Sequence, residues 1–330
     1  MKKLINDPFD FVDEMLEGFL LAHADKIERV GRRAVARVGG PTPGKVGVVI
    51  GGGSGHLPAF IGYVGLGGAD AAPVGNVFAS PPAKPVLEAT RAANGGAGVI
   101  YSYGNYAGDV MNFDRAAAMA EPEGISVKTV LVTDDVASAP KSDQHLRRGI
   151  AGDFFVFKAL AAKAATMADL ESVYQAGQKA NDNTRTMGVA LSACTVPANG
   201  KPTFSLGEDE MEIGLGIHGE PGLRRARIEP VDRVVEEMFA AIEADLEIAG
   251  SDVAVLINGL GATPPEELYL IYRHLAKLLE ARKIKTKKLY IGEYVTSLEM
   301  AGASISLMRL DPELHDLVMA PADCPMFSQR

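Results

Sequence analysis

Several features that mark whole classes of protein are scarce in this sequence. Its 330 residues include only two cysteines, Cys194 and Cys324, with no CxxC or Cys/His spacing. That pattern argues against a structural zinc site or a disulfide framework, so we expect no metal and a reducing, cytoplasmic compartment. The net charge is −9 with no long run of either sign. Nucleic acid and anionic membranes are therefore not expected partners.

Long hydrophobic runs are also missing. Asp7 and Pro8 interrupt the basic start of the chain, and no later apolar stretch approaches the length of a bilayer span. We therefore expect neither a signal peptide nor a membrane helix. The composition, 47% apolar and 23% charged, is normal for a soluble globular protein with a large core. The length predicts about two domains, because single cores stop growing at roughly 250 residues.

Short apolar runs typical of buried strands alternate along the chain with helical patterns. The expected strands are "KVGVVIGG", "GAGVIYSYGN", "VKTVLVTDD", "DVAVLINGLG" and "KKLYIGEYV". The expected helices are "NDPFDFVDEMLEGFLLAH", with Asp7 as N-cap, "DRAAAMA", "FKALAAKAATMADLESVYQAGQKA", "VDRVVEEMFAAIEADL" and "PPEELYLIYRHLAKLLEARK". This alternation predicts an α/β fold with a largely parallel sheet.

The alternation breaks after the long helical pattern that ends near residue 180. The stretch "NDNTRTMGVALSACTVPANGKPTF" is rich in small and turn-forming residues. We place a domain boundary near residues 183–190, which gives an N-terminal α/β domain over 1–185 and a C-terminal α/β domain over 186–330. Each domain is expected to hold a mainly parallel or mixed sheet flanked by helices.

A glycine-dense loop follows the first of these strands, in "VVIGGGSGHLPAF" at residues 48–60. A Walker loop would need lysine and then Ser/Thr where His56 and Leu57 stand. A dinucleotide fingerprint or a nucleophile elbow would need glycine at position 56. What remains is a turn that exposes backbone N–H groups, with Ser54 and His56 as the only side chains for chemistry. Such a turn can hold a small polar molecule or an oxyanion, or it is a structural turn that His56 caps.

Two later loops contain further candidates. Asp109 in "GNYAGDVMNF" stands where a helix N-cap is expected, although a carboxylate at a strand end can equally act as acid or base. His218 in "MEIGLGIHGEPG" lies among glycines at 214, 216, 219 and 222. A histidine needed only for packing would not require so flexible a frame, so function is favoured there.

The remaining polar candidates have ordinary structural explanations. The other four histidines are expected to be surface or structural residues, namely His23, His145, His274 and His315. The loop "NGLGATPPEELYLIY" is interpreted as a turn in which Thr263 caps the following helix.

Taken together, "GGGSGHLPAFIGYVG", "GNYAGDVMNF", "LSACTVPANGKPTF", "MEIGLGIHGEPG" and "NGLGATPPEELY" resemble the substrate-binding K subunit of dihydroxyacetone kinases. The resemblance runs through nearly the whole chain. It implies a two-domain α/β unit, a homodimer, and a short ketose held covalently as a hemiaminal on His218. It also implies that His56 is the acid/base group at the phosphorylated hydroxyl, and that Asp109 hydrogen-bonds the substrate hydroxyls and assists proton transfer. The loop of Gly53, Ser54 and Gly55 would hold the substrate.

The resemblance explains why the glycine loop has no Walker lysine. The chain has neither a Walker loop nor an acidic "GDGD"-type magnesium motif. The resemblance therefore implies no cofactor in this chain and ATP, or ADP with Mg recharged by a phosphotransferase-system protein, on a separate nucleotide-binding L subunit.

The aspartate loop departs from the family pattern at one position. Members that act on dihydroxyacetone commonly have lysine where this chain has Gly104. We interpret the change as removing a donor and opening space, a hint of a longer ketose such as erythrulose. The alternative function is a non-catalytic ketose sensor or co-activator related to this subunit.

Overall fold

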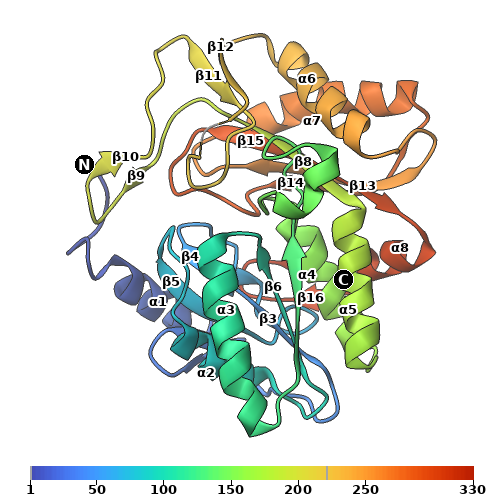
Figure 1. Ribbon diagram of the computed structural model, residues 1–330. Helices are drawn as coiled ribbons and strands as arrows, with labels where there is room; N and C mark the ends of the chain where they lie inside the picture. The colour runs from blue at the N-terminus through green and yellow to red at the C-terminus, as the bar shows by residue number, and fades with distance from the viewer. Residues whose placement is uncertain (1, 221) are drawn as a thin grey trace.

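The computed structural model describes residues 2–220 and 222–330, so Met1 and Pro221 lie outside the described residues. Two sheets, one above the other in Figure 1, organise the chain. The first has seven strands in the order β1-β2-β5-β3-β6-β7, with β4 paired to β5. Their bounds are β1 (Ile27–Val30), β2 (Ala34–Arg37), β3 (Gly47–Ile50), β4 (Gly52–Ser54), β5 (Ala71–Val77), β6 (Val99–Gly104) and β7 (Val127–Val132). Strands β5, β3, β6 and β7 run parallel, whereas β1 and β2 pair antiparallel.

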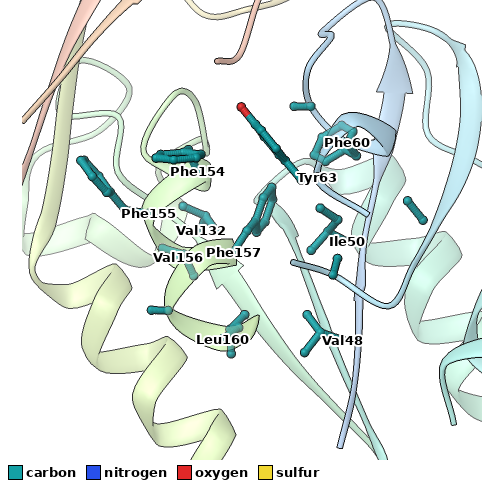
Figure 2. Packing of buried hydrophobic residues seen from close by; sticks show 14 of the residues in the cluster. Val48, Ile50, Phe60, Tyr63, Val132, Phe154, Phe155, Val156, Phe157 and Leu160 are labelled. Atoms are coloured by element: carbon teal, nitrogen blue, oxygen red, sulfur yellow. The ribbon is translucent and has the colours of Figure 1, made fainter. Parts of the chain in front are cut away.

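Helices cover both faces of this first sheet. They are α1 (Phe11–Ala22), α2 (Ala83–Ala93), α3 (Ala107–Ala120), α4 (Asp153–Ala165) and α5 (Leu170–Asp182). Successive side chains of a strand point to opposite faces, and β3 shows the result. Val48 and Ile50 pack into the cluster of buried residues that contains α4, as Figure 2 shows. Val49 belongs to the cluster formed with α2 and α3.

The second sheet has six strands in the order β12-β11-β8-β15-β13-β14. Their bounds are β8 (Thr184–Ala190), β11 (Glu210–Ile213), β12 (Arg224–Arg227), β13 (Asp252–Gly259), β14 (Lys285–Gly292) and β15 (Gly302–Leu310). Only β13 and β14 pair in parallel. Helices α6 (Val231–Asp245) and α7 (Pro265–Ala281) contribute to its buried cluster. This sheet is therefore mixed and mostly antiparallel, unlike the first.

Short elements complete the described chain. They are η1 (Ile61–Tyr63), η2 (Glu121–Glu123), η3 (Lys141–Leu146), the paired β9 (Thr195–Val196) and β10 (Lys201–Pro202), α8 (Pro312–Met319), and the paired β16 (Ala322–Asp323) and β17 (Ser328–Gln329). No helix in residues 2–220 and 222–330 is both long enough and apolar enough to cross a membrane.

The α/β class predicted from the sequence is confirmed, with local corrections. The long helical pattern is two helices, α4 and α5, because Met167 between them has φ 62°. Helix α1 begins at Phe11 rather than near Pro8, and Asp7 accepts the Phe9 N–H in the turn before it at 2.8 Å. The stretch near residues 183–190, interpreted as a break, contains β8, which is buried along its whole length.

A buried ion-pair network links the two halves of the chain. Arg147 donates two hydrogen bonds to the Asp245 carboxylate, at 2.9 and 2.6 Å, and Arg185 donates to the same group. Burial alone would raise the pKa of Asp245, but the hydrogen bonds from Arg147 and Arg185 lower it to about 2. The domain boundary near residue 185 stays a prediction. Helix α8 follows that boundary in the sequence but packs on α4 of the first half.

Candidate active site

The first glycine loop passes so close to other backbone that side chains are excluded from it. A Cβ on Gly53 would lie 2.6 Å from the Ala79 nitrogen, and Gly55 has φ +102°. Both positions therefore require glycine. Ser54 donates its hydroxyl to the Gly75 carbonyl at 2.7 Å, so this side chain supports the loop itself.

His56 leaves this loop in one defined orientation. Its Nδ1–H donates to the Thr296 carbonyl at 2.7 Å, since a carbonyl can only accept. The ring stacks on Phe78, with centroids 5.0 Å apart, and is 1% exposed. Burial lowers the pKa of His56 to about 3. The ring is therefore neutral near pH 7, and its Nε2 carries a lone pair.

His218 is oriented by Glu220, two residues further along the chain. Its Nδ1–H donates to Glu220 Oε1 at 2.8 Å, and its backbone N–H donates to Oε2 at 3.0 Å. Burial raises the pKa of Glu220, but the hydrogen bond from His218 outweighs it, and the value falls to about 2. The ionised carboxylate accepts from Nδ1, which leaves Nε2 of His218 as the free ring nitrogen.

The two free nitrogens meet. Nε2 of His218 lies 3.1 Å from Nε2 of His56. Because both Nδ1 atoms are donors elsewhere, two lone pairs face the same space, and a hydrogen bond between them needs one shared proton. The arrangement can present a nucleophile and a base to one small molecule.

A segment of the second half ties the two histidine loops together. The Thr296 carbonyl accepts from His56, and the Leu298 N–H donates to the Gly55 carbonyl at 2.8 Å. Between them, the Ser297 hydroxyl donates to the carbonyl of Ile217, the residue before His218. The residues 296–298 thus bridge the loops that carry His56 and His218.

Asp109 is not the N-cap that its position suggested. The cap position belongs to Tyr106, and Asp109 is the third residue of α3. Its Oδ1 is buried without a partner among the described residues. Burial raises the pKa of Asp109 to about 6, although a hydrogen bond with Ser80 and the charge of His218 oppose the rise. A carboxyl poised near neutral pH suits acid/base work.

The Dak1 domain matches residues 17–326 of this chain. The chain belongs to the Dak1 family. It is 48% identical over 331 residues to PTS-dependent dihydroxyacetone kinase 2, dihydroxyacetone-binding subunit DhaK, of Listeria innocua, covering 99% of each chain. It is 43% identical over 332 residues to the L-erythrulose kinase of Pectobacterium atrosepticum, covering 99% of this chain but 56% of that relative.

A solved structure matches this Dak1 chain over nearly its whole length. The dihydroxyacetone kinase operon co-activator Dha-DhaQ superposes with a TM-score of 0.90 at 32% identity, covering 96% of this chain and 98% of its own. Both an enzyme subunit and a co-activator are therefore similar to this Dak1 chain.

Gly104 does not leave the open space expected from the sequence. A Cβ there would lie 3.0 Å from both the Gly149 carbonyl oxygen and Tyr106 Cε2. The Tyr106 hydroxyl donates to that same carbonyl at 3.0 Å. The expectation of open space at Gly104 is therefore wrong, because backbone and an anchored aromatic ring fill the position in this Dak1 chain. The longer ketose itself stays a prediction.

Sequence reasoning missed the groups that surround the histidines. Tyr106 meets the His218 ring edge to face, with centroids 4.7 Å apart, and Phe78 lies 5.3 Å from the same ring. Phe78 follows β5, outside the candidate loops, whereas Tyr106 stands inside "GNYAGDVMNF" and Glu220 inside "GIHGEPG". The presence of Tyr106 and Glu220 in those segments was the available signal, but their contacts depend on the fold of the Dak1 domain.

The remaining candidates lie outside the cluster. Thr263 does not cap α7, whose cap position is Pro264; its hydroxyl instead bonds the Gly302 backbone. His274 pairs with Asp232 and Glu236 on the surface of the second half. Among residues 2–220 and 222–330 of the Dak1 chain, no group of three or more His, Cys, Asp or Glu side chains is placed to hold a metal ion.

Proposed function

We propose that this chain is the ketose-binding subunit of a dihydroxyacetone-type kinase, a phosphotransferase with an alcohol group as acceptor. The observation that carries the proposal is the 3.1 Å approach of the two lone-pair nitrogens of His56 and His218. The Listeria and Pectobacterium relatives, named as dihydroxyacetone and erythrulose kinases, support this substrate class. Dihydroxyacetone and erythrulose are both candidate substrates.

In this proposal His218 binds the ketose covalently. Its Nε2 attacks the carbonyl carbon and forms a hemiaminal. A three-carbon ketone offers little surface, and non-covalent contacts supply about 1.5 kcal/mol per heavy atom at best. A reversible C–N bond adds affinity and orientation together, and it rejects glycerol and other polyols, which have no carbonyl.

His56 and Asp109 then act on the terminal hydroxyl. The buried, neutral His56 accepts the hydroxyl proton, and Asp109 hydrogen-bonds the substrate and assists that transfer. The backbone of Gly53, Ser54 and Gly55 brings peptide groups close to the substrate, as the tight packing of that loop allows. The placement of these groups around the terminal hydroxyl matters most for the rate, because phosphoryl transfer depends mainly on geometry and charge stabilisation.

The phosphoryl donor is proposed to reside on another protein. A nucleotide-binding L subunit would supply it, either as ATP with Mg or as bound ADP recharged by a phosphotransferase-system protein. The name of the Listeria relative, a PTS-dependent kinase subunit, supports the second route for that relative. A homodimer and a cytoplasmic location stay predictions.

Intact-mass measurement with dihydroxyacetone or erythrulose tests the residue roles. His218→Ala should abolish the mass adduct, whereas His56→Ala should keep the adduct and lose phosphoryl transfer in the presence of an L subunit. Persistence of the adduct in His218→Ala would overturn the assignment of the covalent residue.

A second candidate function is a ketose sensor that regulates transcription. The similarity to the co-activator Dha-DhaQ, with a TM-score of 0.90, favours it specifically. A sensor can retain His218 for binding, but it has no need of His56 and Asp109 for transfer. Reconstitution with an L subunit and ATP separates the two functions, since a sensor forms no phosphorylated product with any ketose.

A further inference from the structure

We propose that Glu220 is a positioning residue for the covalent step: it holds His218 in the Nδ1–H tautomer and balances the positive charge of the ring once Nε2 is bonded to the ketose. This inference rests on the proposed function. It assigns a role to a carboxylate that touches the nucleophilic ring, not the substrate.

The carboxylate is built into the turn by two hydrogen bonds. One oxygen accepts from His218 Nδ1 at 2.8 Å and the other accepts from the His218 backbone N–H at 3.0 Å. Both ring and backbone of one residue are thereby held by one group. A carboxylate bonded to the ring alone would leave the His218 backbone free to rotate, and the imidazole would move with it.

The glycines of the motif make room for these two hydrogen bonds between His218 and Glu220. A Cβ on Gly216 would lie 2.3 Å from Glu220 Oε2, so only glycine leaves room for the carboxylate. Gly219, between the two partners, has φ +84°, a conformation that turns the chain back and favours glycine. The sequence of this turn is therefore organised around the contact between His218 and Glu220.

The tautomer decides whether His218 can react. A neutral imidazole has one N–H and one lone pair. With Nδ1–H committed to Glu220, the lone pair is on Nε2, the atom that faces His56. Without the carboxylate, the ring can place its proton on Nε2, and that nitrogen then has no lone pair with which to attack a carbonyl.

The charge balance of the covalent step also needs the carboxylate. The Nε2 lone pair forms a bond to the carbonyl carbon, the π bond of the carbonyl breaks, and its electron pair moves to oxygen. That oxygen takes one proton from the solvent. The His218 ring keeps Nδ1–H and carries the one positive charge that this proton brings. Releasing Nδ1–H instead would place a lone pair against the ionised Glu220.

The other charged groups near His218 leave Glu220 as its direct counterion. Asp109 senses the charge of His218, but it has a raised pKa and no hydrogen bond to the ring. Arg148 lies close to Gly216, and its own charge is paired with Asp135 at 2.8 Å. Tyr106 contributes an aromatic edge only.

The test uses the full chain labelled with 15N-histidine and ketose labelled with 13C at the carbonyl carbon. Long-range 1H–15N spectra report the tautomer of His218, whose signals are identified by their absence in His218→Ala. We expect Nδ1–H in the wild type, free and as adduct. In Glu220→Gln the tautomer should change and the ketose affinity should fall about ten- to a hundredfold, the scale of a lost charge-assisted hydrogen bond.

Glu212→Gln is the matched control. Glu212 is a buried carboxylate of the same segment that accepts from the Gly222 N–H at 3.0 Å and from Arg225, with no hydrogen bond to His218. It should leave tautomer and affinity unchanged. If Glu220→Gln fails to fold, the wild-type adduct decides: a His218 ring without Nδ1–H at pH 7 overturns the proposal.

The outcomes separate this inference from the proposed function. An unchanged tautomer and affinity in Glu220→Gln contradict the role of Glu220 alone, with the ketose-binding function intact. A wild-type chain that forms no adduct with either ketose contradicts the proposed function itself and, with it, the counterion role.

Discussion

The Nε2 atoms of His56 and His218 lie 3.1 Å apart although 162 positions separate them in the sequence. A third segment of the chain also holds the two histidine loops together. The short segment 296–298 does so, because it bonds to Gly55 and His56 on one side and to Ile217 on the other. The site therefore depends on a third segment that has no catalytic group of its own.

Ser297→Ala should loosen this bridge. The Ser297 hydroxyl is fully buried and donates to the Ile217 carbonyl, and an unpaired buried acceptor costs about 1–3 kcal/mol. We expect a loss of that size in the free energy of unfolding, measured in urea, together with weaker adduct formation. Ser142→Ala, an exposed position, is the control. Wild-type ketose affinity in Ser297→Ala would contradict the bridging role.

His56→Gln should make the protein less sensitive to acid. The pKa of His56 is about 3 in the folded chain against an ordinary 6.5, so between these values the unfolded chain binds more protons. The stability contributed by neutral His56 is complete above pH 6.5 and is lost as the pH falls, by about 2 kcal/mol at pH 5. Urea unfolding at several pH values should show a flatter profile in His56→Gln than in the exposed control His145→Gln. Parallel profiles would refute the lowered pKa.

Asp109→Asn should change stability in the opposite sense. Its folded pKa is about 6 against an ordinary 3.8, so burial of the carboxylate lowers the free energy of unfolding above pH 6, and this cost vanishes below pH 3.8. We expect the variant to gain about 1–3 kcal/mol at pH 8 and nothing at pH 3.5, while phosphoryl transfer is lost. Asp114→Asn, an exposed change on the same helix, should be neutral at both pH values. A gain that is the same at pH 3.5 and pH 8 would rule out ionisation as the cause.

Asp245→Ala should be strongly destabilising. The change removes the carboxylate that Arg147 and Arg185 share in the interior. Two buried guanidinium groups would lose their counterion, which costs about 3–5 kcal/mol. Thermal and urea unfolding measure the loss, with the exposed Asp316→Ala as control. A loss under about 1 kcal/mol would show that the network is not essential.

Gly104→Ala should cost stability rather than leave the site unchanged. The added Cβ meets the Gly149 carbonyl and the Tyr106 ring at 3.0 Å, and overpacking of this kind costs about 1–3 kcal/mol. Because Tyr106 touches His218, ketose affinity should fall as well. Gly18→Ala provides the control without crowding, since no atom lies within 4 Å of its Cβ and, like Gly104, it has no positive φ. An unaltered affinity in Gly104→Ala would show that the Tyr106 ring has room to move.

The sequence by itself determined the α/β class, most strands of the parallel sheet, and the glycine loops that carry the two histidines. These features depend on local patterns: apolar runs of strand length, helical spacing, and glycine where the backbone must approach closely, as at Gly53 and Gly55. Local pattern failed where neighbours in space override it. The sequence pattern predicted one helix where Met167 separates two, and it missed the buried strand β8 among turn-forming residues. It also placed Asp109 at the N-cap of α3, a position that belongs to Tyr106.

Only the tertiary structure decided how the candidate residues meet. The tautomers of His56 and His218 follow from Thr296 and Glu220, and the crowding at Gly104 follows from Gly149 and Tyr106. The contacts of His56 with Thr296 and of Gly104 with Gly149 join residues 240 and 45 positions apart, and no periodicity in the sequence encodes such distances. The glycine loops fix which residue types are available for chemistry, whereas long-range hydrogen bonds and burial fix which nitrogen is free and which carboxyl titrates near neutral pH.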